Sequence, residues 1–212
     1  CADAMTTRTE EGARQMTLEA GKPLAQARRE WQLSIDQFRW YAEEARRIYG
    51  RIVESRAPGG RIEIHHEPVG VVAAFTAWNF PAFLIARKVA PALAAGCSII
   101  VRPSRETPGT AAIMMDCLMQ AGVPAGVFNL VHGDGLGVGV PLSSHPEVDM
   151  VSFTGSTRAG VEVAKAAAPT VKRVAQELGG KSPNIVLDDA DLKAAVTGGV
   201  NSVMMNSGQS CR

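Results

Sequence analysis

From Gly70 onward the chain alternates short apolar segments with longer amphipathic ones, and this alternation constrains the fold more than any other feature. The short segments are rich in valine, isoleucine and alanine, and we predict strands at 71–76, 98–101, 127–131, 150–153, 171–177 and 184–187. We predict helices at 81–95, 108–121, 156–168 and 191–205, and a short one that ends near Ser144 after a glycine-rich turn. Strands that alternate with helices of this length build parallel sheets. We therefore expect an α/β fold in which helices flank a parallel sheet.

The first part of the chain has a different pattern. Residues 1–20 are predicted to form a polar amphipathic helix, and Gly21-Lys22-Pro23 interrupts it. Residues 24–45 have apolar positions at spacings of three and four, which predicts a long helix with one buried face. Residues 51–60 are expected to be a loop. The alternation around Ile62–Ile64 predicts a half-buried strand.

Composition narrows the class of partner. The chain has 212 residues, 46% of them hydrophobic and 20% charged, with a net charge of +1. This is the composition of a globular protein with a buried core. A near-neutral charge disfavours a nucleic-acid surface and favours a small-molecule partner. Charged residues, proline or glycine interrupt every long apolar run, so we expect no membrane segment.

The cysteines indicate the compartment. The four cysteines are scattered without a CxxC pair, which predicts free thiols in a reducing, cytoplasmic environment, and no signal peptide is apparent. We expect no metal site, because His65 and His66 would face opposite sides of a strand. The chain begins with Cys1 rather than methionine and stops at Arg212, which suggests a fragment of a longer protein.

Three residues, far apart in the sequence, carry groups suited to covalent acyl chemistry. Cys211 ends the polar turn Ser207–Cys211 that follows an apolar helical segment, Glu177 ends a predicted strand, and Asn79 lies in Trp78-Asn79-Phe80-Pro81. A thiol nucleophile, a carboxylate base and an amide donor are the parts of such a mechanism. Each also has a structural interpretation. The cysteine could be a small core residue, the asparagine a helix cap, and the glutamate either buried against a partner or raised in pKa.

Two further segments could bind a nucleotide. Phe153–Gly160 joins a strand to a helix, where Gly155 permits a tight turn, Ser156 can cap the helix, and free N–H groups favour a phosphate. Arg102, Ser104 and Arg105 follow another strand, at the end where parallel sheets bind ligands. An ordinary capped helix and a solvated basic turn are the structural alternatives, and no GxGxxG or Walker loop is present.

Four segments in this order resemble the successive motifs of the aldehyde dehydrogenase superfamily: Trp78-Asn79-Phe80-Pro81, Phe153-Thr154-Gly155-Ser156, Glu177-Leu178-Gly179-Gly180-Lys181 and Gly208-Gln209-Ser210-Cys211. The likeness runs from about Ala2 to Arg212. It implies N-terminal helices and a Rossmann-like NAD(P)-binding domain over residues 1–183. Residues 184–212 would begin a second α/β catalytic domain, truncated after the nucleophile.

The resemblance also implies roles. Cys211 would attack an aldehyde to give a thiohemiacetal and then, after hydride transfer to NAD or NADP, a thioester. The Asn79 side chain and the Cys211 N–H would hold the oxyanion, and Glu177 would activate the hydrolytic water. The implied cofactor contacts are Trp78, Thr154, Gly155, Ser156, Leu178, Arg102, Ser104 and Arg105. The family often has Lys-Pro-Ser-Glu where this chain has Arg102-Pro103-Ser104-Arg105, so loss of the carboxylate inclines the prediction towards NADP.

The substrate prediction depends on Arg87. The stretch Asn79–Leu93 is similar to that of succinate-semialdehyde dehydrogenases, which implies that Arg87 pairs with the distal carboxylate of a semialdehyde. A surface salt bridge is the alternative. Two other functions stay open: a CoA-acylating relative, which should lack the base Glu177, and a nucleotide-binding fragment without activity of its own. The parent protein is expected to be a homodimer or homotetramer.

Overall fold

The computed structural model describes residues 1–211 and confirms the predicted parallel sheet. Its five strands lie in the order β5-β4-β3-β6-β7. They are β3 (Val71–Phe75), β4 (Ser98–Arg102), β5 (Phe128–Leu130), β6 (Met150–Thr154) and β7 (Arg173–Glu177). All neighbouring strands are parallel. The strand order reverses between β3 and β6, and ligands of open α/β sheets bind at the carboxyl ends of the strands beside such a reversal.

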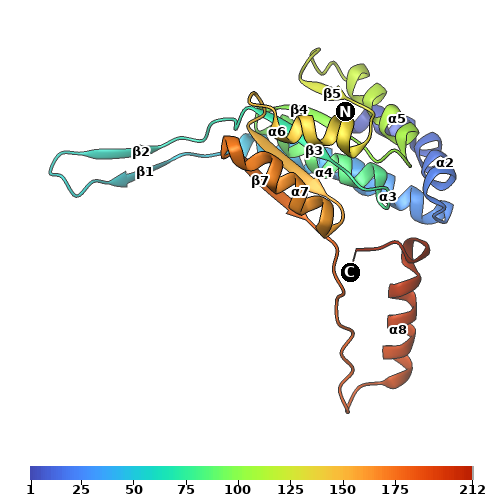
Figure 1. The fold of residues 1–212 in the computed structure, drawn as a ribbon. Helices are drawn as coiled ribbons and strands as arrows, with labels where there is room; N and C mark the ends of the chain where they lie inside the picture. The colour runs from blue at the N-terminus through green and yellow to red at the C-terminus, as the bar shows by residue number, and fades with distance from the viewer. Residues whose placement is uncertain (212) are drawn as a thin grey trace.

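Helices cover both faces of the sheet (Figure 1). One layer contains the helices α1 (Ala2–Thr7), α2 (Thr9–Ala20), α3 (Leu24–Glu44), α4 (Pro81–Ala94) and α5 (Pro108–Gln120). The other contains the helical turn η2 (Gly135–Gly139), α6 (Val140–Ser144) and α7 (Thr157–Ala167). Alternate residues of β3 divide between them, because Val72 and Ala74 pack in the larger core while Ala73 and Phe75 pack in the smaller one.

The first twenty residues form two helices rather than the predicted one. Arg8, with a φ of −109°, ends α1 and precedes α2. Its guanidinium pairs with Glu11 and with Asp116 of α5. The indole Nε1 of the fully buried Trp31 donates to the Met5 carbonyl at 2.8 Å, which ties α1 to α3. The break therefore lets two short helices pack separately against α3 and α5.

Before the sheet, the predicted strand around Ile62–Ile64 is confirmed, and the predicted loop over residues 51–60 is wrong in its first part. Residues 51–54, expected in a loop, form β1 (Arg51–Glu54), which pairs antiparallel with β2 (Arg61–Ile64). The resulting hairpin projects away from the body of the chain (Figure 1). Because nothing in the described part of the chain covers its faces, Ile62 is exposed (47%), and only Ile64 of this strand is partly buried.

The C-terminal part lies apart from the sheet (Figure 1). The predicted strand at 184–187 is wrong: these residues form no ladder within the described chain, and Ile185 is 75% exposed. The predicted helix is confirmed as α8 (Leu192–Met204), capped by Asp191, whose carboxylate accepts from Ala194 N at 3.0 Å. A helical turn, η4 (Met205–Gly208), follows it.

Three further features concern the residues that the structure describes. None of their helices is both long and apolar enough to cross a membrane. Within residues 1–211, no group of three histidine, cysteine or acidic side chains could hold a metal ion. All four cysteines are free thiols: Cys97 and Cys117 are buried, Cys1 is partly buried, and Cys211 is exposed.

The packing of α2 on α3 leaves no room for a side chain at Gly12. A Cβ there would lie 2.4 Å from Cε3 of Trp31. We expect Gly12→Ala to lower the free energy of unfolding of the complete protein by about 1–3 kcal/mol, as overpacking does. Denaturant titration would measure the change. The control is Trp31→Leu, in whose background the same substitution should cost less; an equal cost in both backgrounds would contradict the clash.

Candidate active site

The turn before Cys211 has an unusual backbone. Asn206 and Ser207 have φ values of 56° and 55°, and Gly208 has a φ of 77°. Left-handed geometry is easy for glycine and is also visited by asparagine, whereas a serine in it costs of order 1–3 kcal/mol and needs support from its surroundings. The reactive turn, as we call residues 205–211, therefore requires external contacts to keep its shape.

The turn between α2 and α3 supplies several of these contacts. Ser207 Oγ donates to the Gly21 carbonyl at 3.0 Å, and Gln209 Nε2 donates to the Ala20 carbonyl at 2.8 Å. The backbone N–H of Asn206 donates to Gln26 Oε1 at 2.6 Å. The segment Gly21-Lys22-Pro23, predicted only as an interruption between helices, thus contributes to the surface against which the reactive turn packs.

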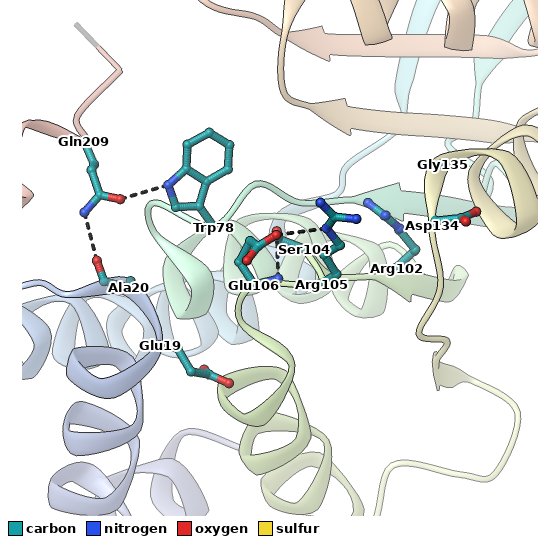
Figure 2. Close-up of a pocket in the computed structure, with 10 residues that line it drawn as sticks. All are labelled: Glu19, Ala20, Trp78, Arg102, Ser104, Arg105, Glu106, Asp134, Gly135 and Gln209. Atoms are coloured by element: carbon teal, nitrogen blue, oxygen red, sulfur yellow. Dashed lines mark hydrogen bonds and ion pairs between the residues drawn. The ribbon is translucent and has the colours of Figure 1, made fainter.

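The segment just before α4 supplies further contacts. Trp78 Nε1 donates to Gln209 Oε1 and Asn79 Nδ2 donates to the Gln209 carbonyl, both at 2.9 Å (Figure 2 shows the Trp78 bond). Asn79 therefore lies against the segment that leads into Cys211, and the second hydrogen of its amide remains able to donate. The helix-cap alternative for Asn79 is wrong, because Phe80 is the residue that precedes α4 and the Asn79 side chain bonds to the Gln209 carbonyl instead.

Cys211 lies on a cavity of about 470 Å³ beneath the reactive turn. Apolar side chains, including Leu33 and Phe83, form part of its wall, and Arg87 also reaches it. The Arg87 guanidinium lies 5.5 Å from the centre of the Phe83 ring. Among the ion pairs of the described residues none involves Arg87, so the salt-bridge alternative finds no partner there.

Glu177 lines a second cavity of about 220 Å³, next to the first. The two cavities share Leu84 and Arg87 of α4. The Glu177 side chain is exposed, so the expectation that it is buried against a partner is wrong for the described chain: β7 is the edge strand of the sheet. Lys88 lines the same cavity and donates to Ser152 Oγ at 2.9 Å. Burial lowers the pKa of Lys88 to about 8, although the Glu177 carboxylate opposes this shift.

The predicted nucleotide contacts after β4 line a third cavity, of about 610 Å³ (Figure 2). Trp78, Arg102, Ser104 and Arg105 all reach it. Arg102 Nε donates to the Gly133 carbonyl at 2.8 Å, and burial lowers the pKa of Arg102 while Asp134 opposes the shift.

Arg105 does not present an isolated charge to this cavity. Its Nε lies 2.9 Å from Glu106 Oε1, in an exposed ion pair that Figure 2 shows beside Ser104. Glu106, next to Arg105, thus supplies a carboxylate at the edge of this cavity.

The motif between β6 and α7 forms the expected helix start. Ser156 Oγ accepts from Ala159 N at 3.3 Å, and Gly155 N donates to the Glu177 carbonyl at 3.1 Å, which holds the ends of β6 and β7 together. Thr154 ends β6 and lines the cavity of Glu177. Leu178 packs against α7, so close that a Cβ on Gly160 would lie 2.6 Å from its Cδ2.

These positions fit a dinucleotide. The carboxyl ends of β3, β4 and β6 meet at the reversal of the strand order, and arginine side chains and the start of α7 lie on that edge. Lys22 and Glu30 line the cavity of Cys211, and Lys88 lines that of Glu177. The sequence analysis did not predict these three residues as part of the site. The only signal for Lys22 was its place between two helices. The other two have no motif around them.

Residues 1–212 match the family model described as "Aldehyde dehydrogenase family". The chain is 60% identical over 152 residues to the 3-succinoylsemialdehyde-pyridine dehydrogenase of a Pseudomonas species, an alignment that covers 72% of this chain. It is 47% identical over 199 residues, 94% of its length, to the succinate-semialdehyde dehydrogenase [NADP(+)] GabD of Escherichia coli (strain K12). The structure of a succinate-semialdehyde dehydrogenase from Burkholderia pseudomallei matches 99% of the chain with a TM-score of 0.97 and 46% identity.

The chain spans less than half of these relatives. It covers 32% of the Pseudomonas protein, 41% of GabD and 44% of the Burkholderia structure.

The lowered pKa of Lys88 can be tested in the complete protein that carries this chain. Because burial lowers the pKa of Lys88 to about 8, its neutral amine should form from that pH upward. Labelling of Lys88 by an amine reagent, followed by peptide mass spectrometry, should be half-maximal near pH 8. An ordinary lysine reaches that point at about pH 10.4, and the same value for Lys88 would contradict the shift.

Proposed function

This chain belongs to the aldehyde dehydrogenase family, and on that premise we propose that the complete protein oxidises an aldehyde to a carboxylate with NAD or NADP. One observation carries the proposal: the hydrogen bond from Asn79 Nδ2 to the Gln209 carbonyl, which brings an amide donor against the turn that ends in Cys211. A nucleophile beside a fixed hydrogen-bond donor is the arrangement that acyl chemistry requires.

In the proposed mechanism the Cys211 thiolate attacks the aldehyde carbon, and the carbonyl oxygen becomes an oxyanion. The free N–H of the Asn79 amide and the backbone N–H of Cys211 donate to that oxyanion. Removal of one such donor typically costs about 10²–10³ in rate. After oxidation the acyl group remains on Cys211 as a thioester. Glu177, exposed on the adjoining cavity, takes a proton from the water that hydrolyses it.

The nicotinamide cofactor supplies the oxidising power by accepting a hydride. Trp78, Arg102 and Ser104 would hold it from the cavity after β4, and Thr154, Gly155 and Ser156 from the start of α7. Arg102 is already oriented by the Gly133 carbonyl. Arg105 in its pair with Glu106 is the residue that would decide between NAD and NADP, since a 2′-phosphate would have to compete with that carboxylate.

We propose a semialdehyde with an anionic far end, such as succinate semialdehyde, as substrate. Arg87 supports this, because its exposed guanidinium lines the cavity of Cys211 and makes no ion pair among the described residues. A carboxylate would match the planar donor set of an arginine. The name of the Pseudomonas relative indicates a pyridine-bearing aldehyde instead, and the aromatic wall at Phe83 could receive such a ring.

Isolated residues 1–212 are proposed to turn over poorly. Both Cys211 and Glu177 are exposed in this chain, and catalysis of this kind needs a nucleophile and base held within contact of the substrate and shielded from bulk water. The active form is proposed to be a cytoplasmic homodimer or homotetramer of the complete protein.

The chemistry is tested by Cys211→Ala and Glu177→Gln in the complete protein, with absorbance of the reduced nicotinamide as readout. Cys211→Ala should abolish turnover. Glu177→Gln should retain a burst of reduced cofactor, equal to one per active site, while the steady-state rate falls by about 10²–10⁴-fold, because only thioester hydrolysis needs the base. Cys1→Ala is the matched control and should leave the rate unchanged.

Two results would point elsewhere. Nucleotide binding without turnover on any aldehyde would favour a binding module. Turnover that survives Glu177→Gln and accelerates with CoA would favour a CoA-acylating enzyme.

The substrate is tested by Arg87→Gln. Loss of a charge-assisted hydrogen bond is worth about 1.5–3 kcal/mol, so kcat/KM for succinate semialdehyde should fall by about 10- to 150-fold. A neutral aldehyde of similar length, measured with the same variant, is the internal control and should change little. An equal fall for both substrates would show that Arg87 does not recognise the anionic end.

A further inference from the structure

A buried ion pair lies directly behind the residues that carry the proposed chemistry. Lys22 Nζ pairs with Glu30 Oε2, and their side chains are only 1% and 3% exposed. Burial lowers the pKa of Lys22 and raises that of Glu30, while each partner opposes the shift of the other. Taking two charges out of water costs several kcal/mol per ion, and a well-packed apolar pair often stabilises a fold equally well. Stability alone therefore does not account for this pair.

The pair is bonded to the start of α4. Glu30 Oε1 accepts the backbone N–H groups of Ala82 and Phe83, at 3.0 and 3.1 Å, which are otherwise unpaired donors of the first helical turn. Lys22 Nζ donates to the Asn79 carbonyl at 2.8 Å. The two charges thus bind the backbone on both sides of Phe80, and the Lys22 ammonium also lies 4.6 Å from the centre of its ring.

The same backbone carbonyl receives the reactive turn. Asn206 Nδ2 donates to the Asn79 carbonyl at 2.7 Å, next to Lys22 Nζ. Asn206, itself buried, is one of the residues in left-handed geometry. The Asn79 peptide is therefore held by the ion pair on one side and holds the reactive turn on the other. Lys22 and Glu30 also line the cavity of Cys211.

We propose that Lys22 and Glu30 are positioning residues, which set the Asn79 amide and the reactive turn in register so that the oxyanion donor and Cys211 face the same point. This rests on the function proposed above. Neither residue transfers a proton or touches the substrate carbonyl. Their effect arises because directional bonds to a carbonyl and two N–H groups fix the orientation of the Asn79 peptide, which apolar packing at the same place would not. A misplacement of about 1 Å at a reacting centre can cost 10²-fold in rate.

The test uses the complete protein with the charge-neutral double variant Lys22→Met/Glu30→Gln. Because no unpaired charge stays buried, we expect it to fold. The kcat should fall by about 10- to 100-fold, while KM for the aldehyde changes by less than about threefold, as for a defect in oxyanion support. Asp149→Asn is the matched control: Asp149 also accepts a backbone N–H, that of Val71, at the opposite end of β3, and its kcat should not change.

A double-mutant cycle with Asn79→Ala separates positioning from general destabilisation. If the ion pair acts partly through the Asn79 amide, the double variant should lower kcat by a clearly smaller factor once that amide is absent. Fully additive losses would overturn the proposal. If the double variant does not fold, Glu30→Asp, which keeps the charge but shortens the carboxylate arm, replaces it in the same cycle.

A second readout does not depend on turnover. Displacement of the reactive turn should change the rate at which iodoacetamide alkylates Cys211 by at least about fivefold in the double variant, with no change in Asp149→Asn. An unchanged alkylation rate would overturn the positioning proposal even if the enzyme is active. Conversely, a changed rate in a protein that oxidises no aldehyde would support the positioning role and reject the function proposed above.

Discussion

The carbonyl oxygen of Asn79 is the point on which the site depends. It accepts one hydrogen bond from Lys22, before α3, and another from Asn206, after α8. Three segments that are distant in the sequence therefore meet at a single acceptor with two lone pairs. The left-handed turn before Cys211 stays in place because its donors and acceptors end on this junction and on the neighbouring α2–α3 turn. The Asn79 amide and the Gln209 carbonyl link the same two segments directly.

The sheet positions the residues at the carboxyl ends of its strands. Parallel strands have their carboxyl ends at one edge, so Arg102, Thr154 and Glu177 lie along the same edge although each ends a different strand. The reversal of strand order between β3 and β6 opens that edge to a ligand. The helix α4 starts at the same edge: its Arg87 lines both the cavity of Cys211 and that of Glu177, and its Lys88 lines the cavity of Glu177. The cavity after β4 is lined by Trp78, just before α4, and the cavity of Cys211 is lined by Phe80 and Phe83.

Local patterns predicted much of this arrangement. The helix from Pro81, the Ser156 cap and the strands from β3 to β7 follow from spacing and capping chemistry, which act within a few residues. The two wrong strand predictions concern segments whose structure depends on whether another strand lies beside them. Residues 51–54 form a strand because β2 pairs with them, and 184–187 form none because no strand in the described chain lies beside them. Periodicity reports which side chains could be buried, but not what lies next to them.

The sequence by itself determined the α/β class, the order of the motifs and the chemical identity of the thiol, amide and carboxylate. Only the tertiary structure decided that Glu177 is exposed and that Arg105 is paired with Glu106. It also decided that Lys22, paired with Glu30, donates to the Asn79 carbonyl. The physical reason is that helix and strand preferences are properties of neighbouring residues. A hydrogen bond between residues 22 and 79, or 79 and 206, leaves no periodic trace in the chain; only the packing of the helices on the sheet brings those groups within reach.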